Sequence, residues 1–152
     1  DHRDLHSFPT RRSSDLPEVR QKTSDRAVLR ALHYYDENER VRAMYTALEN
    51  GDLDAFLDNV IRSGESSWKL LQNLYVGGST EQSLALACAL SERMLRGSGA
   101  WRVHGGGFAG TILAFVPHYK LASYVEKMDA VFGAGACTVL DIRPVGAKKV
   151  EL

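Results

Sequence analysis

Residues 100–116 read AWRVHGGGFAGTILAFV, and this stretch decides the fold. Apolar and polar residues alternate over Trp101–His104, which is typical of a half-buried strand. Four of the next six residues are glycine, and the apolar run from Thr111 to Val116 then fits a central strand. The pattern therefore predicts two strands joined by a tight glycine loop.

Helices are predicted upstream of the strands, because apolar residues recur there at helical spacing. The segments run from Ser24 to Asn50, from Asp52 to Ser63, from Ser66 to Tyr75 and from Ser79 to Arg96. Ser24 and Asp52 stand where N-cap residues belong, and Ser79 with Gln82 forms a capping-box pattern. Ser63-Gly64 is expected to end the second helix. In the first helix, the apolar positions at helical spacing are Val28, Ala31, Leu32, Tyr35, Val41, Met44, Tyr45 and Leu48.

Downstream of the strands the pattern predicts one more helix and one more strand. Pro117 suits a helix entry, and the apolar face from Leu121 to Phe132 is broken by Gly133 to Gly135. Cys137 to Arg143 is predicted to be a third strand. Helices followed by strand, strand, helix and strand predict the α+β class, with a ferredoxin-like antiparallel sheet packed with helices.

The segment Asp1–Leu16, DHRDLHSFPTRRSSDL, shows neither helical nor strand periodicity. Read alone, it is typical of a disordered polar tail. It also matches one translated frame of a common short-read sequencing adapter, codon by codon. We therefore interpret residues 1–16 as an artefactual, disordered tail, and expect one domain over residues 17–152, itself a piece of a longer protein.

Composition excludes several classes of protein. The chain has 152 residues with 19 basic and 19 acidic side chains, so its formal net charge is zero. A nucleic-acid or membrane-surface binder needs a basic excess, and no apolar run approaches the roughly 20 residues of a membrane helix. Cys88 and Cys137 lack metal-ligand spacing and are interpreted as buried thiols, and no other cluster of side chains suggests a metal site. We expect a cytoplasmic monomer without nucleic-acid or membrane partners.

The glycine loop has several readings. Gly105, Gly107 and Gly110 satisfy G-x-G-x-x-G, but the dinucleotide fingerprint must open a helix, and here a strand follows. A Walker loop fails as well, since no Lys-Ser or Lys-Thr pair follows Gly110. A plain hairpin turn needs only one or two glycines. The surplus favours a ligand-facing loop, in which backbone N–H groups approach a bound group closely, and a plain turn remains the alternative.

The stretch A-W-R-V-H-G-G-G-F-A-G-T at 100–111 resembles the third conserved motif of the GHMP small-molecule kinases. Its usual form in galactokinases is close to G-A-R-M-T-G-G-G-F-G-G-C, from which His104, Ala109 and Thr111 depart. Arg30 to Val41 resembles the R-A-x-H…E-N-x-R-V helix of galactokinases, and Ala47 to Leu53 their A-L-x-x-G-D-L turn. The segment Ser63 to Ser67 stands where that family often has S-H-x-S-L.

The resemblance implies the C-terminal domain of a GHMP kinase of the galactokinase type. That family transfers a phosphoryl group from ATP to galactose with Mg²⁺, giving galactose 1-phosphate. Its phosphate loop, catalytic aspartate and sugar-binding motif lie in the N-terminal part and match no segment here, so the resemblance assigns no catalytic or metal-binding residue to this chain. It implies that the chain alone is inactive. The loop expected at the substrate and nucleotide cleft comprises His104, Gly105, Gly106, Gly107, Phe108, Ala109, Gly110 and Thr111.

Two alternatives stay open: a galactokinase-like sugar sensor without turnover, and another GHMP kinase that acts on a different small alcohol. Among other residues, His33 is interpreted as a packed or capping histidine. Arg102 is expected to form a structural ion pair, whereas His104 is balanced between a structural and a functional role. Trp68 and Trp101 are interpreted as core aromatic residues.

Overall fold

The computed structural model describes residues 16–108, 110–142 and 144–146. In chain order its elements are α1 (Leu16–Lys22), α2 (Asp25–Glu49), α3 (Leu53–Ser66), the π-helical turn η2 (Ser67–Leu71), α4 (Ser83–Leu95), β1 (Ala100–Val103), β2 (Ile112–Phe115) and α5 (His118–Phe132). The described chain divides into two compact units, one ending at Pro117 and one beginning at His118. Helices combined with a small antiparallel sheet confirm the predicted α+β class and are compatible with a GHMP kinase C-terminal domain.

The helix α1 was not expected. Its first residue, Leu16, is the last residue of the predicted tail, and residues 1–15 lie outside the described part of the chain. Pro17 is suited to the first turn of a helix, and Lys22 pairs with Glu18 one turn earlier at 2.5 Å. These local features favour a short helix ahead of α2.

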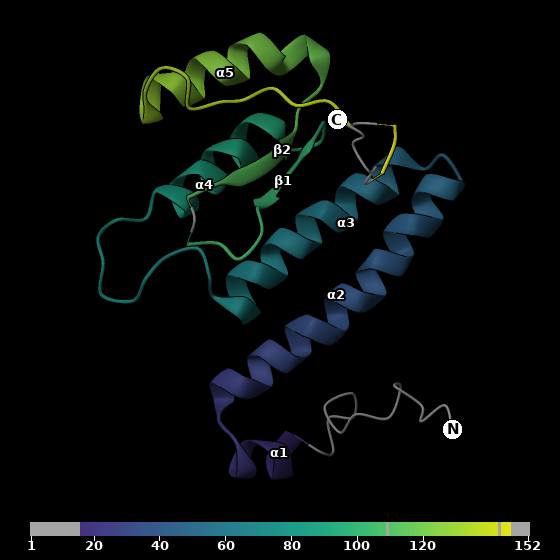
Figure 1. Cartoon of the computed structure of the whole chain (residues 1–152), viewed down its shortest axis with the longest axis vertical. Helices are drawn as coiled ribbons and strands as arrows, with labels where there is room; N and C mark the ends of the chain where they lie inside the picture. The colour runs from purple at the N-terminus through teal and green to yellow at the C-terminus, as the bar shows by residue number, and fades with distance from the viewer. Residues whose placement is uncertain (1–15, 109, 143, 147–152) are drawn as a thin grey trace, which may run out of the picture. The chain divides into compact units, whose positions relative to one another are not determined.

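The helices α2 and α3 form an antiparallel pair (Figure 1). Ser24 caps α2 by accepting the N–H of Ala27 at 3.2 Å, and Asp52 caps α3 by accepting the N–H of Ala55 at 2.9 Å. Both predicted N-caps are confirmed. The second half of α2 is an exception to the expected pattern, because three predicted apolar positions, Val41, Tyr45 and Leu48, are largely exposed.

Gly64 lies inside α3 and does not end it. The predicted stop at Ser63-Gly64 is wrong, because α3 continues to Ser66. A Cβ atom at Gly64 would stand 3.1 Å from the main-chain oxygen of Trp101 and 3.1 Å from Cβ of Arg102. Glycine is used here for the close approach of helix α3 to strand β1, a tertiary reason that helical periodicity does not reveal.

The segment between α3 and α4 also differs from the prediction. The expected third helix is the five-residue turn η2, which ends in a left-handed residue, Gln72. The capping box at Ser79 and Gln82 does not form, because α4 begins at Ser83 and Ser79 instead accepts the N–H of Glu81 at 3.0 Å. Ser79 therefore stabilises a local turn ahead of the helix.

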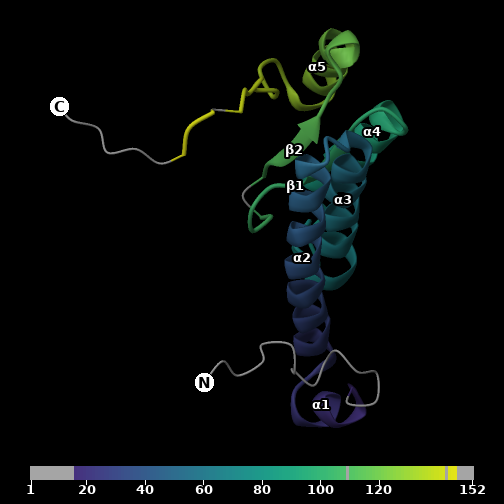
Figure 2. The same ribbon diagram turned by 90° about the vertical axis from the view of Figure 1, so that its right-hand side faces the viewer.

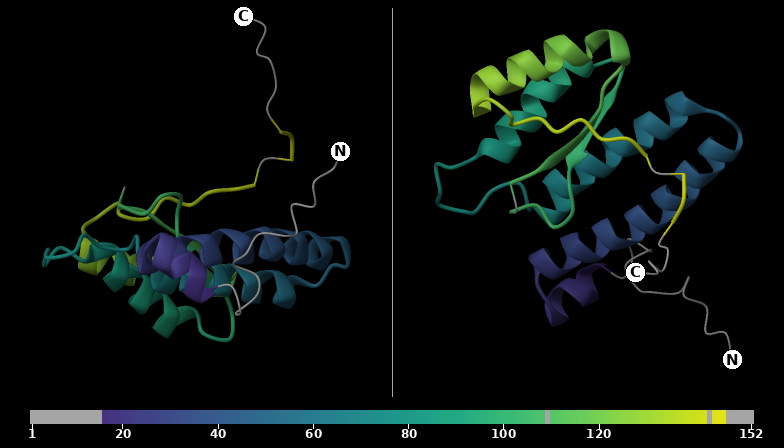
Figure 3. Two further views of the ribbon diagram at one scale, coloured as in Figure 1. Left: turned by 90° about the horizontal axis from the view of Figure 1, so that it is seen from below. Right: turned by 45° about the horizontal axis from the view of Figure 1, so that its top comes forward.

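The strands β1 and β2 pair antiparallel, with Ala100 opposite Phe115 and Val103 opposite Ile112. The helices α3 and α4 flank this hairpin, as Figures 2 and 3 show from other directions. The predicted strand–loop–strand order is confirmed. The core joins the hairpin to α4 through the apolar cluster of Leu74, Leu84, Cys88 and Val103, with Trp101 and Ile112 packed against it.

The second unit consists of α5 and the chain that follows it. The predicted helix is confirmed over His118–Phe132. The predicted strand Cys137–Arg143 is wrong over the described residues 137–142, which form no strand ladder. Instead Asp129 accepts the N–H groups of Gly135 and Cys137, at 3.0 Å and 3.3 Å. Arg143 lies outside the described residues.

Within the described ranges, no helix combines the length and apolar character needed to cross a membrane.

Candidate functional site

The hairpin positions the predicted loop. Ladder pairing ends at Val103 and Ile112, and the N–H of His104 then donates to the carbonyl of Thr111 at 3.1 Å. Residues 104–108, 110 and 111 are thereby gathered into one connection between two paired strands. Ala109 lies outside the described residues.

The loop is largely exposed to solvent. Gly105 and Gly106 are exposed, as are Gly110 and Thr111, and Phe108 is 64% exposed. A Cβ atom added at Gly105 or Gly106 would meet nothing within 4 Å. These peptide groups are therefore open to a molecule approaching from solvent.

Gly107 is the buried member of the loop. Its φ of 79° lies in the left-handed region, and a Cβ atom there would stand 2.0 Å from the main-chain oxygen of Asn73. The N–H of Phe108 donates to that same oxygen at 3.3 Å. Glycine is therefore required at 107 both for backbone conformation and for space.

Asn73 is a contact that the sequence interpretation missed. It follows the turn η2 and lies in no helix or strand. The available signal was weak: two polar residues, Gln72 and Asn73, between Leu71 and Leu74, in a stretch taken for a helix. Its proximity to the loop depends on the tertiary packing of α3 and β1.

A polar network links β1, the strand that leads into the loop, to α2 and α3. Arg102 Nη1 lies 3.9 Å from Glu37 Oε2, which accepts a hydrogen bond from the hydroxyl of Ser63 at 2.5 Å. Arg40 pairs with the other carboxylate oxygen of Glu37. The predicted structural ion pair of Arg102 is confirmed, with Glu37 as its partner.

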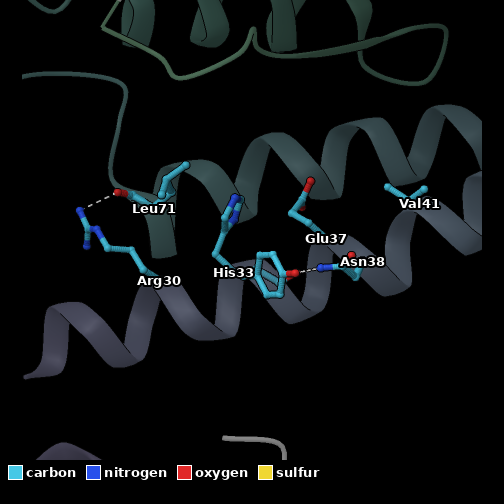
Figure 4. A pocket seen from close by; sticks show the side chains of 7 residues that line it. Arg30, His33, Glu37, Asn38, Val41 and Leu71 are labelled. Carbon is cyan, nitrogen blue, oxygen red and sulfur yellow. Dashed lines mark hydrogen bonds between the residues drawn. The ribbon is translucent and has the colours of Figure 1, made fainter. Parts of the chain in front are cut away.

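A shallow cavity of about 430 Å³ lies beside α2 (Figure 4). Its lining comprises Arg30, His33, Tyr34, Glu37, Asn38, Val41 and Leu71. Two of these lining residues are bonded to each other, since Arg30 Nη2 donates to the carbonyl of Leu71 at 2.9 Å. Leu71 is thus next to the cavity, and Asn73, two residues later, is next to the glycine loop.

His33 faces this cavity from α2. Its Nδ1 atom is 2.9 Å from Ser66 Oγ, so it joins α2 to the end of α3. Burial lowers the pKa of His33, while the nearby charge of Glu37 opposes that effect. The interpretation of His33 as a packed histidine is confirmed, and its neutral form is the one favoured in the fold.

The described residues contain no group of three or more His, Cys, Asp or Glu side chains arranged to hold a metal ion. At Gly105 and Gly106 the loop presents to solvent the backbone N–H groups of residues without side chains.

The glycine loop thus connects the two strands of the hairpin and is held on one side by the segment that carries Asn73. Part of the chain is similar to a galactokinase. Over 104 residues, 68% of the chain, it is 33% identical to the galactokinase of Haemophilus influenzae, and it covers 25% of that protein. The chain thus spans about a quarter of the length of the curated relative that it matches. No protein-family model and no solved structure matches the chain.

Proposed function

We propose that this chain is the C-terminal part of a galactokinase. Such an enzyme transfers the terminal phosphoryl group of ATP to the anomeric hydroxyl of galactose and requires Mg²⁺. One observation carries the proposal: the exposed glycine loop between β1 and β2 lies within the motif that resembles galactokinases. The partial identity to a galactokinase supports it.

The proposed role of the loop is to position and polarise. Phosphoryl transfer depends on the alignment of the reacting groups and on stabilisation of the charge that spreads over the transferred oxygens. Backbone N–H groups of Gly105 and Gly106 are suited to that task, because no side chain prevents their close approach. Magnesium, when bound with ATP, supplies further charge neutralisation.

The chain alone is expected to be inactive, because the loop is one wall of a site and phosphoryl transfer needs several. The purified 152-residue chain should therefore show no galactose-dependent release of ADP from ATP and Mg²⁺. Measurable turnover by this chain would contradict the proposed division of the active site.

The decisive experiment uses the complete protein. The reading frame upstream of Pro17 is recovered from genomic DNA, the protein is expressed in full, and ADP release is measured with galactose and with other small alcohols. A galactokinase turns over with galactose, and another GHMP kinase with a different alcohol. A sugar sensor binds galactose, measured by calorimetry, without releasing ADP. If the complete protein neither binds nor turns over any of these substrates, the proposal is contradicted.

The remaining expectations follow from the same proposal. ATP and galactose are the expected ligands of the complete protein, with a cytoplasmic location and a monomeric state. Sedimentation of the complete protein measures the last of these directly.

A further inference from the structure

Asn73 lies directly against the glycine loop. A Cβ atom on Gly107 would stand 2.0 Å from the main-chain oxygen of Asn73 and 2.8 Å from its Nδ2 atom. The N–H of Phe108 donates to the main-chain oxygen at 3.3 Å. The loop therefore contacts both the main chain and the side-chain amide of this residue.

The amide of Asn73 is buried without a hydrogen-bond partner. Asn73 is 3% exposed, and neither Oδ1 nor Nδ2 is paired within the part of the chain that the structure describes. Buried amides are normally paired, because an unpaired one has lost its water without compensation. The next residue, Leu74, belongs to the apolar core. An apolar side chain at position 73 would leave no buried polar atom unpaired.

The backbone that carries Asn73 is also held in an uncommon conformation. Gln72 ends η2 with φ 56° and ψ 44°, and it is the only non-glycine residue with positive φ in the described ranges. Arg30 fixes the same turn by donating to the carbonyl of Leu71. Left-handed residues and π-helical turns are found often at functional sites.

We propose that Asn73 is a positioning residue for the glycine loop, and that its amide forms its hydrogen bonds with Gly105–Phe108 when the loop holds a phosphoryl group. The amide then fixes the peptide groups of this segment, and the N–H groups of Gly105 and Gly106 donate to the phosphoryl oxygens. Open space around Gly105 and Gly106 lets the segment adjust toward Asn73. The nature of the ligand rests on the proposed function, whereas the unpaired amide and its contact with Gly107 do not.

A purely structural role makes the opposite prediction. If the amide stabilises the ligand-free fold, its removal must lower stability. If the amide is kept for a second state, its replacement by an apolar side chain of similar size must raise stability and at the same time lower function. The two roles are therefore separable by measuring both quantities on one variant.

The first measurement uses the purified 152-residue chain without ligand. Asn73→Leu is expected to raise the thermal midpoint by a few degrees. The matched control is Asn59→Leu, because Asn59 Nδ2 is paired with the carbonyl of Ala55 at 2.8 Å. The control is expected to leave the midpoint unchanged or lower it. A lower midpoint for Asn73→Leu overturns the proposal.

The second measurement uses the complete protein with ATP, Mg²⁺ and galactose. Asn73→Leu is expected to lower kcat by about tenfold or more, with little change in KM and no loss of thermal stability. Turnover equal to that of the wild type overturns the role of Asn73. A wild-type protein without turnover counts against the proposed function alone, and the stability comparison on the 152-residue chain still tests Asn73.

Discussion

Arg102 Nη1 of β1 lies 3.9 Å from Glu37 Oε2 of α2. Ser63 of α3 donates to the same carboxylate, and Arg40 pairs with it as well. A single acidic side chain thus joins two helices to the strand that leads into the glycine loop. Because these side chains are mostly buried, water replaces such contacts poorly.

Replacing Glu37 by Gln should destabilise the chain. The substitution leaves Arg40 and Arg102 without their carboxylate, and we expect the free energy of unfolding to fall by about 1–3 kcal/mol. Urea denaturation followed by circular dichroism measures the change. Glu65→Gln is the control, because its pair with Lys69 is exposed and should contribute under about 0.5 kcal/mol. Equal effects of the two substitutions would show that the Glu37 network does not stabilise the fold.

Gly107→Ala should be far more damaging than Gly106→Ala. The first substitution combines a left-handed backbone with a clash against Asn73, whereas the second places its methyl group in open space. We expect a loss of at least about 2 kcal/mol for Gly107→Ala and under about 1 kcal/mol for Gly106→Ala. Denaturant titration of both variants tests the difference, and equal losses would contradict the described packing of the loop.

His33 should make the chain less stable in acid. Its folded-state pKa is lowered, so the unfolded chain binds a proton more readily than the folded chain does. The stabilising contribution is complete above the usual histidine pKa of about 6.5 and is lost as pH falls through the lower folded-state pKa. Thermal midpoints between pH 8 and pH 5 measure it. His33→Gln should flatten that part of the profile, and an unchanged slope would rule out His33 as its source.

Cys88 and Cys137 should differ in reactivity. Burial raises the pKa of Cys88 to about 11, and burial, aided by the charge of Asp129, also raises the pKa of Cys137. Cys88 is the more deeply buried thiol, so iodoacetamide at pH 8 should modify it at least about tenfold more slowly than it modifies Cys137. Peptide mapping by mass spectrometry follows both sites. Full denaturation should make the two rates equal, and equal rates in the native chain would contradict the burial of Cys88.

The exposed apolar side chains of α2 should promote self-association of this chain when it is made by itself. Tyr34, Val41, Tyr45 and Leu48 are each 57% to 65% exposed and recur at helical spacing. The double change Tyr45→Ser and Leu48→Ser should lower association in sedimentation while altering the free energy of unfolding by under about 1 kcal/mol. Val60→Ala, at a position 2% exposed, should instead cost about 2 kcal/mol. Unchanged association of the double variant would exclude this face as its cause.

Local signals predicted the elements whose causes are local. Ser24 and Asp52 cap helices because a side-chain oxygen satisfies nearby N–H groups, and this depends only on neighbouring residues. The hairpin could be predicted for a similar reason, since its two strands are adjacent in the chain. Gly64 was misinterpreted because its cause, the approach of β1, lies far away in sequence.

In the candidate site, too, the features with local causes could be predicted and those with distant causes could not. The glycines marked the loop, but nothing near Asn73 in sequence indicated that it would contact Gly107. The run Cys137–Arg143 was predicted to be a strand, yet a strand needs a pairing partner, which the residues of the run itself cannot supply. Asp129 of α5 instead accepts the N–H groups of Gly135, just before that run, and of Cys137, its first residue.

The exposed face of α2 also bears on the fate of the chain inside a cell. Apolar side chains that remain in water on a folded protein are the features that chaperones retain and proteolytic systems remove. A polypeptide that always exposes such side chains competes with unfolded proteins for the same chaperones and proteases. Made by itself, this chain should turn over quickly and accumulate only where synthesis outpaces degradation.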